Sequence, residues 1–280
     1  MPALLAAVRS AGADATAVPW DDPQADWASY DLAVIRSTWD YTWRTDAFLA
    51  WAERCAALTV LANPPGVLRW NADKSYLGDL AAAGVPVVET RYLPPGEGGP
   101  GALPADREFV IKPTRGAGGR LAARHQPGDP AAAAHLAALH ERGLTALVQP
   151  YQSGVDRTGE RALVHLGSAP LHAVRKGAVL APGVPYDDRK VSHPGLTPWE
   201  PTPAELAAAR TALAAVPDAA GPLLYARVDL VDGDDGAPRV MELELIEPNL
   251  FLHIRPESLS AVARHLVVAA FAAEAPDAAR

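Results

Sequence analysis

The clearest hydrophobic pattern lies near the C-terminus, where polar and apolar residues alternate over 225–231 and again over 239–245. Alternation with a period of two predicts β-strands, and the Asp-Gly pairs between the two stretches are typical of a turn. The two stretches therefore predict a β-hairpin. Its register depends on whether the turn is centred on the Asp-Gly pair at 235 or on the pair at 232, and the pattern leaves both open.

The register centred on Asp235 and Gly236 opposes two carboxylates. Asp229 then faces Glu242 across the hairpin, and the neighbouring pair on the same face is an arginine and a glutamate. The other face then carries Val228, Leu230, Met241, Leu243 and Leu245. Directly opposed carboxylates repel each other, so this register predicts a divalent cation that prefers oxygen ligands, Mg²⁺ or Mn²⁺. The alternative is a solvated charged face with each acid paired to an arginine.

Upstream of the hairpin, the pattern alternates between helices and short strands, which indicates an α/β protein. Helices are predicted at 4–12, 46–58, 71–84, 130–142, 202–216 and, after the hairpin, 257–274. Strands are predicted at 31–36, 59–62, 108–113, 146–150, 160–166 and 170–175, with 63–66 as a loop. The Pro/Gly-rich segment 94–105 predicts a connector into a second lobe. The long irregular segment 177–201 is expected to be either disordered or a lid.

Composition narrows the classes of protein to consider. The chain has 280 residues, a net charge of -8 and one cysteine. The acidic balance argues against a nucleic-acid or anionic-membrane partner, and a single cysteine excludes a disulfide framework within the chain. No apolar run reaches the ~18 residues of a membrane helix. These features predict a cytoplasmic protein.

Lysine is rare in this chain and therefore informative. Of 25 basic residues only four are lysine: Lys74, Lys112, Lys176 and Lys190. A lysine among so many arginines indicates a place where a compact ammonium group is wanted. Lys112 ends a predicted strand just before the glycine-rich segment 114–120, whose backbone N–H groups could approach a phosphate closely, although hairpins use such turns as well.

A second candidate segment follows the first predicted strand. The loop 36–41 is polar and aromatic, and ligands of open α/β sheets bind beyond the carboxyl ends of strands. The loop is therefore a candidate edge of a substrate site. In the alternative interpretation, Trp39 and Tyr41 only pack this loop onto the following helix.

The order of these features resembles the ATP-grasp superfamily of carboxylate ligases, over about residues 70–250. The series is Lys74 at a helix start, Gly84-Val-Pro, Lys112 before a glycine-rich turn, a strand ending at Gln149-Pro150, and the carboxylate hairpin. The sequences of segments 39–41 and 242–248 look most like those of the subgroup that contains the O-ureidoserine cyclo-ligase of cycloserine biosynthesis.

The resemblance implies an α/β fold of the ATP-grasp type with three parts. An N-terminal parallel α/β domain would span 1–72, a central lobe of α+β type 73–155, and a C-terminal domain with an antiparallel sheet and the metal site 156–280. ATP would bind between the lobes. ATP-grasp ligases usually open with a β-strand, whereas Met1 already stands at a predicted helix. An upstream start is favoured over the loss of this strand.

The resemblance also implies roles for individual residues. ATP would be bound by Lys74, Lys112, Gly116, Gly118, Gly119, Gln149, Pro150, Tyr151 and Asp156. The catalytic residues, facing the transferred phosphoryl group or the substrate carboxylate, would be Arg161, Arg175 and Arg227. The metal ligands for Mg²⁺ or Mn²⁺ would be Asp229, Glu242 and Glu244. The family commonly has asparagine where this chain has Glu244, so this residue is either a ligand or the partner of Arg227.

The implied activity is ATP- and Mg²⁺-dependent ligation. A small-molecule carboxylate would be activated as an acyl phosphate and joined to an amine-type nucleophile, either a second molecule or a group of the same molecule. The expected partners are these small-molecule substrates, and a homodimer is compatible with the family. One alternative is a catalytically silent ATP-binding regulatory protein, and another is a structural protein whose acidic residues are only surface charge.

Overall fold

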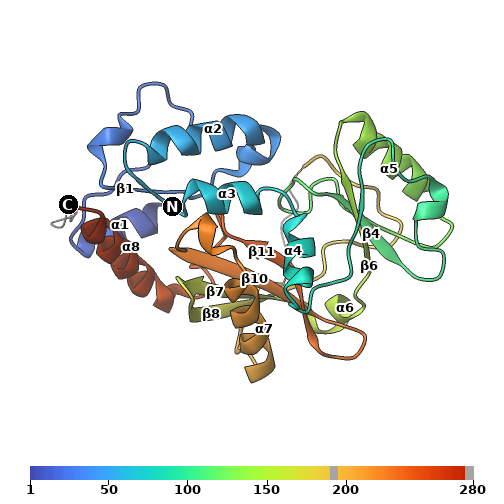
Figure 1. Cartoon of the computed structure of the whole chain (residues 1–280). Helices are drawn as coiled ribbons and strands as arrows, with labels where there is room; N and C mark the ends of the chain where they lie inside the picture. The colour runs from blue at the N-terminus through green and yellow to red at the C-terminus, as the bar shows by residue number, and fades with distance from the viewer. Residues whose placement is uncertain (190–194, 275–280) are drawn as a thin grey trace.

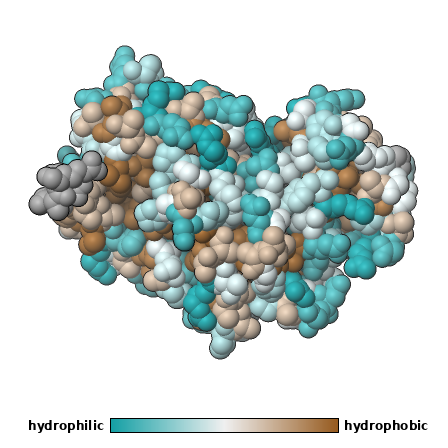
Figure 2. Space-filling model, viewed as in Figure 1, coloured by the Kyte–Doolittle hydropathy of each residue, from teal (hydrophilic) through white to brown (hydrophobic). Residues whose placement is uncertain are grey.

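The computed structural model describes residues 1–189 and 195–274, so Lys190 lies outside the described residues. The chain forms a body with an N-terminal α/β layer, a central antiparallel sheet, and a lobe that extends to one side and carries α5, β4 and β6 (Figure 1). Figure 2 shows the outline of the molecule indented between this lobe and the body. No described helix has the length and apolar character needed to cross a bilayer.

The structure contains eight α-helices among its described residues. They are α1 (Pro2–Ser10), α2 (Thr45–Ala56), α3 (Pro65–Asn71), α4 (Tyr76–Ala82), α5 (Pro130–Glu141), α6 (Gly154–Thr158), α7 (Pro203–Ala214) and α8 (Leu259–Glu274). Short 3₁₀ helices occur at η1 (Trp27–Ser29), η2 (Trp39–Trp43), η3 (Pro100–Ala102), η4 (Asp218–Ala220) and η5 (Pro256–Ser258).

The strands of the described residues form three sheets. They are β1 (Leu32–Val34), β2 (Val60–Ala62), β3 (Arg91–Leu93), β4 (Phe109–Pro113), β5 (Ala123–His125), β6 (Ala146–Pro150), β7 (Glu160–Leu166), β8 (Ala169–Lys176), β9 (Thr197–Trp199), β10 (Tyr225–Asp232) and β11 (Pro238–Glu244). β1 and β2 pair in parallel, the lobe has the order β3-β6-β4-β5, and the central sheet has the order β11-β10-β7-β8-β9.

The region around Lys74 differs from the prediction. The segment 63–66 was expected to be a loop and 71–84 one helix, but the structure has α3 and α4 with Lys74 in the turn between them. Pro65 stands in the first turn of α3, where its fixed φ favours a helix. The backbone N–H of Lys74 donates to the carbonyl of Thr114 at 2.9 Å instead of continuing a helix. A contact distant in sequence therefore places Lys74 against the glycine-rich turn.

The central sheet has a different core on each of its faces. Leu163 of β7 belongs to the core under α7, whereas Ala162 and Val164 belong to the core that includes residues of α1 and α8. The side chains of β7 thus alternate strictly between the two faces. This alternation decides which charged residues at the end of β7 share the face of Ala162 and Val164 and can reach a site there.

The predicted hairpin is present as β10 and β11. Asp229 pairs with Glu242, as the register centred on Asp235 predicts, and Arg227 pairs with Glu244. The predicted turn is wrong in detail, because Asp232 pairs with Pro238 and leaves residues 233–237 as the loop.

A β-bulge compensates for this longer loop. Leu230 pairs with Val240 and Asp229 with Glu242, so Met241 is an extra residue without a partner on β10. Val240, instead of the predicted Met241, belongs to the core under α7. Met241 lines the cavity described below.

Candidate active site

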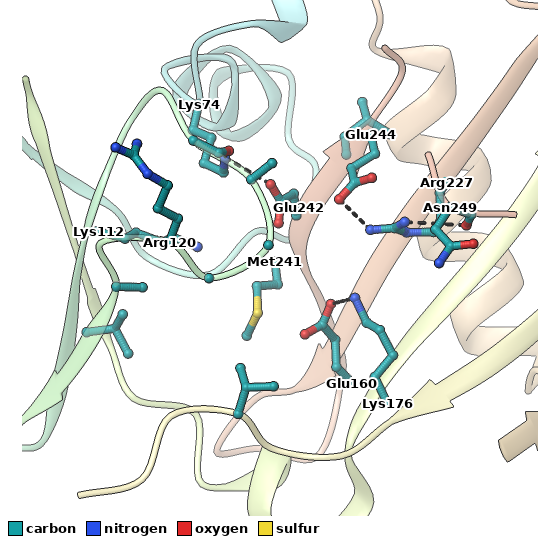
Figure 3. A pocket seen from close by; sticks show the side chains of 18 of the residues that line it. Lys74, Lys112, Arg120, Glu160, Lys176, Arg227, Met241, Glu242, Glu244 and Asn249 are labelled. Atoms are coloured by element: carbon teal, nitrogen blue, oxygen red, sulfur yellow. Dashed lines mark hydrogen bonds and ion pairs between the residues drawn. The ribbon is translucent and has the colours of Figure 1, made fainter. Parts of the chain in front are cut away.

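A cavity of about 300 Å³ lies where the three parts of the chain meet. Its walls come from the loop after β1, the turn before α4, the lobe, and the hairpin. Figure 3 shows Lys74, Lys112 and Arg120 on one side of the cavity and Arg227, Glu160 and Lys176 on the other. Most of the predicted site residues line this cavity: Lys74, Lys112, Gly116, Gly118, Gly119, Gln149, Pro150, Tyr151, Arg227, Glu242 and Glu244.

Lys74 and Lys112 bring two ammonium groups into the cavity from different elements. The Nζ of Lys74 donates to the carbonyl of Gly116 at 2.5 Å and lies 3.0 Å from a carboxylate oxygen of Glu242. Lys112 projects from β4, and burial lowers the pKa of its amine. Within the described chain Lys112 has no carboxylate within ion-pair distance. It is therefore a positive charge available to an anionic ligand.

The glycine-rich turn closes one side of the cavity. Gly118 and Gly119 have φ angles of 64° and 70°, a region that residues with a Cβ rarely adopt. The turn can therefore approach a ligand with its backbone, as the glycine pattern predicts. At its start, Arg115 contacts Asp73 at 3.1 Å and so ties the turn to the segment that carries Lys74.

A buried ionic network lies under the hairpin. Asp229 accepts hydrogen bonds at 2.8 Å from Nε and Nη2 of Arg227, and its Oδ2 also accepts one at 2.8 Å from Nζ of Lys176. Lys176 makes a further, short ion pair with Glu160, and Arg227 makes one with Glu244 (Figure 3). Carboxylates and cations thus alternate across the floor of the cavity.

The charges of this network set the protonation states. Burial opposes the ionisation of Asp229, but Arg227 and Lys176 beside it hold its pKa below the usual range. Burial raises the pKa of Glu160 to about 7, against the opposing effect of Lys176. Burial also raises the pKa of Glu244. For Glu242 the cations Lys74 and Lys112 outweigh burial, so its pKa is lowered.

The acidic residues of the hairpin fit a divalent metal ion. Asp229, Glu242 and Glu244 each offer a carboxylate oxygen, and these atoms lie within 4.8 Å of one another. An all-oxygen set of this kind suits Mg²⁺ or Mn²⁺. Glu242 and Glu244 are only partly buried, whereas Asp229 is fully buried and already holds two cations. The two glutamates are therefore the ligands most open to an ion.

The structure does not place Arg161 and Arg175 at the cavity. Arg161 is buried on the other face of the sheet, where it contacts Glu205 of α7 at 2.7 Å and also pairs with Asp232. Arg175 of β8 is opposite Arg161 of β7 in the strand register, and it does not line the cavity. Strand alternation explains both positions, because Asp229 faces Ala162 and every second residue of β7 shares its face.

Two residues that face the site were missed for the same reason. Glu160 and Lys176 stand next to the two arginines in sequence, pair with each other in register, and line the cavity. The rarity of lysine already pointed to Lys176, and Glu160 is its partner in the register of β7 and β8. Asp156 does not line the cavity. It lies behind Tyr151, whose hydroxyl donates to its carboxylate at 2.6 Å, and it pairs with Arg124 at 3.1 Å.

The loop after β1 forms the remaining wall. Arg36 and Trp39 line the cavity, and Arg36 donates from Nη1 to the carbonyl of Pro248 at 2.6 Å. Tyr41 lines the cavity too, and its ring lies 5.1 Å from the ring of Phe48 in α2. Both interpretations of this loop thus hold in part, since it packs on the helix and also borders the cavity.

An antiparallel lobe and a larger sheet around a cavity with paired lysines, a glycine-rich turn and clustered carboxylates define an ATP-grasp ligase. The same fold occurs in the ATP-grasp ligase PsnB, solved with a phosphomimetic variant of its minimal precursor, Mg and ADP (TM-score 0.62, 17% identity, 98% of this chain and 94% of that chain).

More specific matches identify the family. The first 63 residues match the family model of the N-terminal domain of D-cycloserine synthetase DcsG. Cycloserine biosynthesis protein DcsG of Streptomyces lavendulae is 40% identical over 267 residues, which cover 90% of this chain and 87% of that protein. The crystal structure of D-cycloserine synthetase DcsG matches with a TM-score of 0.88 and 37% identity over 96% of this chain and 94% of that chain. The chain belongs to the DcsG family of ATP-grasp ligases.

Proposed function

We propose that this enzyme uses ATP and Mg²⁺ to activate the carboxylate of a small amino-acid-like substrate and to join it to a nitrogen of the same molecule. The observation that carries the proposal is the convergence of the Asp229, Glu242 and Glu244 carboxylates within 4.8 Å of one another, beside the ammonium group of Lys74 and in the same cavity as Lys112. Opposed charges of this kind suit a metal-bound polyphosphate. The ring closure is inferred from the relative D-cycloserine synthetase, whose name gives a cyclic product.

The phosphates of ATP would lie between the lysines and the glycine-rich turn. Lys74 and Lys112 would contact the phosphate oxygens, and the ammonium of Lys74 would leave the carbonyl of Gly116 to do so. Backbone groups of Gln149 to Tyr151, at the end of β6, would line the adenine pocket. Bound Mg²⁺, held by Glu242 and Glu244 with Asp229 behind them, would neutralise charge on the phosphates.

The first chemical step transfers the γ-phosphoryl group from ATP to a carboxylate oxygen of the substrate. It breaks the bond between the γ-phosphorus and the bridging oxygen, and gives ADP and an acyl phosphate. In this step Lys112 and Arg227 would face the charge that moves from ATP to the substrate. Arg36 and Arg227 line the cavity together and would orient the carboxylate.

In the second step, a nitrogen of the substrate attacks the acyl carbon, and inorganic phosphate leaves. The nitrogen loses its proton, so a basic group must lie nearby. Glu244 and Glu247 line this side of the cavity. Since Glu244 would hold the metal ion, we assign the proton to the carboxylate of Glu247. The products are a cyclic amide, phosphate and ADP.

ADP release measured with O-ureidoserine and with D- and L-amino acids tests this proposal. We expect ADP and phosphate to form only with a substrate that carries both the carboxylate and a nitrogen placed to attack it. Mass spectrometry should then detect the cyclic product. Mg·ATP that raises the melting temperature without any substrate-dependent ADP release would favour the catalytically silent regulatory protein instead. Absence of stabilisation by Mg·ATP would refute both.

A further inference from the structure

Arg120 joins three parts of the chain at the mouth of the cavity. It directly follows the glycine-rich turn, and its guanidinium carbon lies 5.4 Å from the ring centroid of Trp43 in η2. Its Nε donates to the backbone carbonyl of Asp188 at 2.8 Å, and its Nη2 lies 3.5 Å from the Asp188 carboxylate. These contacts connect the lobe, the N-terminal layer and the segment after β8.

We propose that Arg120 is a positioning residue whose contact with Trp43 latches the glycine-rich turn over the cavity while the acyl phosphate exists. The proposal rests on the proposed function, because only a reactive intermediate needs such protection. An open turn admits water, and water would convert the acyl phosphate into the original carboxylate and phosphate. ATP would then be consumed without product.

The anchor of Arg120 on the lobe side is well fixed. The carboxylate of Asp188 accepts hydrogen bonds from Nη1 and Nη2 of Arg142 in the turn after α5, at 2.6 and 3.2 Å. One residue earlier, the carbonyl of Asp187 accepts the backbone N–H of Leu121 at 2.8 Å. The segment that holds the guanidinium is thus bound to the same lobe as the turn. Arg120 therefore moves with the lobe.

The contact on the other side is weaker and suits a part that must open in each turnover. Trp43 is 60% exposed, and its ring stands at the edge of the N-terminal layer where Arg120 meets it. An exposed contact between a cation and an aromatic face changes an equilibrium about two- to fivefold. This is enough to favour the closed turn without trapping the products.

Arg120 is distinct from the residues that bind the phosphates in the proposed function. Its side chain is 20% exposed, and its polar contacts within the described chain are all with Asp188. Arg120 also lines the cavity, but its Nε and Nη2 are held by Asp188, whereas Lys112 has no carboxylate within ion-pair distance among the described residues. Removing the Arg120 side chain should therefore change the amount of ATP consumed per product more than the affinity for ATP.

The test compares Arg120→Ala, Trp43→Ala, Trp43→Phe and the double alanine variant with wild type, using the ratio of ADP formed to cyclic product. Arg107→Ala is the control, because Arg107 lies on the same lobe and its side-chain polar contacts with the described residues are all with its neighbour Asp106, at 3.3 Å. We expect a ratio near one for wild type and control. Both single alanine variants should raise the excess of this ratio over one about two- to fivefold, the double variant should raise it no further, and Trp43→Phe should restore the wild-type ratio.

Two results would overturn the latch. One is an unchanged ratio in both alanine variants. The other is an ATP dissociation constant that rises tenfold in Arg120→Ala but not in Trp43→Ala, which would make Arg120 a phosphate ligand. Failure of the proposed function looks different, because wild type itself would then give no product with any substrate. Amide hydrogen exchange of residues 115–122, measured with Mg·ATP and no substrate, reports closure of the turn without catalysis. These amides should be less protected from exchange in Trp43→Ala than in wild type.

Discussion

Two lysines in one cavity are expected to respond oppositely to the same substitution. Lys176 is buried, with a side chain that is 2% exposed between Asp229 and Glu160. Although burial disfavours its charge, these two carboxylates raise the pKa of its amine. Lys112 is also desolvated, and burial lowers its pKa, but it has no carboxylate partner within the described residues. The charge of Lys176 therefore stabilises the fold, whereas that of Lys112 opposes it.

Lys176→Met should destabilise the protein strongly. It removes one member of a buried ion pair and leaves two carboxylates facing each other, a change that costs about 3–5 kcal/mol. In a chain of this size the melting temperature should fall by roughly 10 °C. Lys112→Met removes a desolvated charge and keeps an apolar stem, so we expect the free energy of unfolding to stay within about 0.5 kcal/mol of wild type or to rise.

For ATP affinity we expect the reverse order, with a larger loss in Lys112→Met than in Lys176→Met. If Lys112 contacts a phosphate, its loss removes a charge-assisted hydrogen bond of about 1.5–3 kcal/mol, which corresponds to roughly ten- to a hundredfold weaker binding. Urea denaturation measures the first quantity, and calorimetric titration with a non-hydrolysable ATP analogue measures the second. Equal destabilisation by the two substitutions would refute the distinction between a paired and a free ammonium group.

Three further substitutions test other parts of the structure. Glu242→Gln should lower phosphoryl transfer at least about a hundredfold with a small change in melting temperature, because the Glu242 side chain is 24% exposed; a large loss of stability with activity retained would contradict its assignment. Arg161→Met should destabilise by about 3–5 kcal/mol and leave ATP affinity intact, since Arg161 pairs with Glu205 away from the cavity, while exposed Arg210→Met serves as its control. His135→Phe should reduce the acid sensitivity of stability, measured by urea denaturation at pH 7 and pH 4.5.

The sign for His135 follows from its burial. Burial lowers its pKa from 6.5 to about 4, so the unfolded chain binds a proton in a pH range where the folded chain does not. Stability is therefore lost as the pH falls from 6.5 towards 4, by about 2–3 kcal/mol at pH 4.5. In His135→Phe this part of the loss should disappear. An identical pH dependence in both proteins would show that His135 titrates normally.

The sequence predicts much of this fold because its elements are defined by local patterns. The pairing of Asp229 with Glu242 follows from alternation in two strands, and the hairpin of β7 and β8 is found at the predicted place. The predicted helix after Thr202 begins with a capping box, in which the side chains of Thr202 and Glu205 each accept a hydrogen bond from the other's backbone N–H group. In each case the neighbours along the chain determine the conformation.

Tertiary contacts explain what could not be predicted. Lys74 leaves the expected helix because its N–H bonds to Thr114, a residue forty positions further along the chain. Arg161 and Arg175 were chosen for their charge, which gives no information about the face of the sheet on which they lie. That face follows only from the pairing of β7 with β10, which also brings Glu160 and Lys176 to the cavity.

The unpaired Met241 separates the acidic end of the hairpin from its tip. Because the extra residue lies between them, the facing of Asp229 and Glu242 depends on the pairing on its far side and not on the length of the loop 233–237. The tip can therefore accept inserted residues, such as a peptide tag or a fluorophore site, without shifting the acids. Removing Met241 would leave Val240 and Glu242 adjacent and still opposite Leu230 and Asp229, so regular alternation would keep Glu242 on the cavity face, and the strand would lose only its bulge and the part of the cavity wall that Met241 supplies.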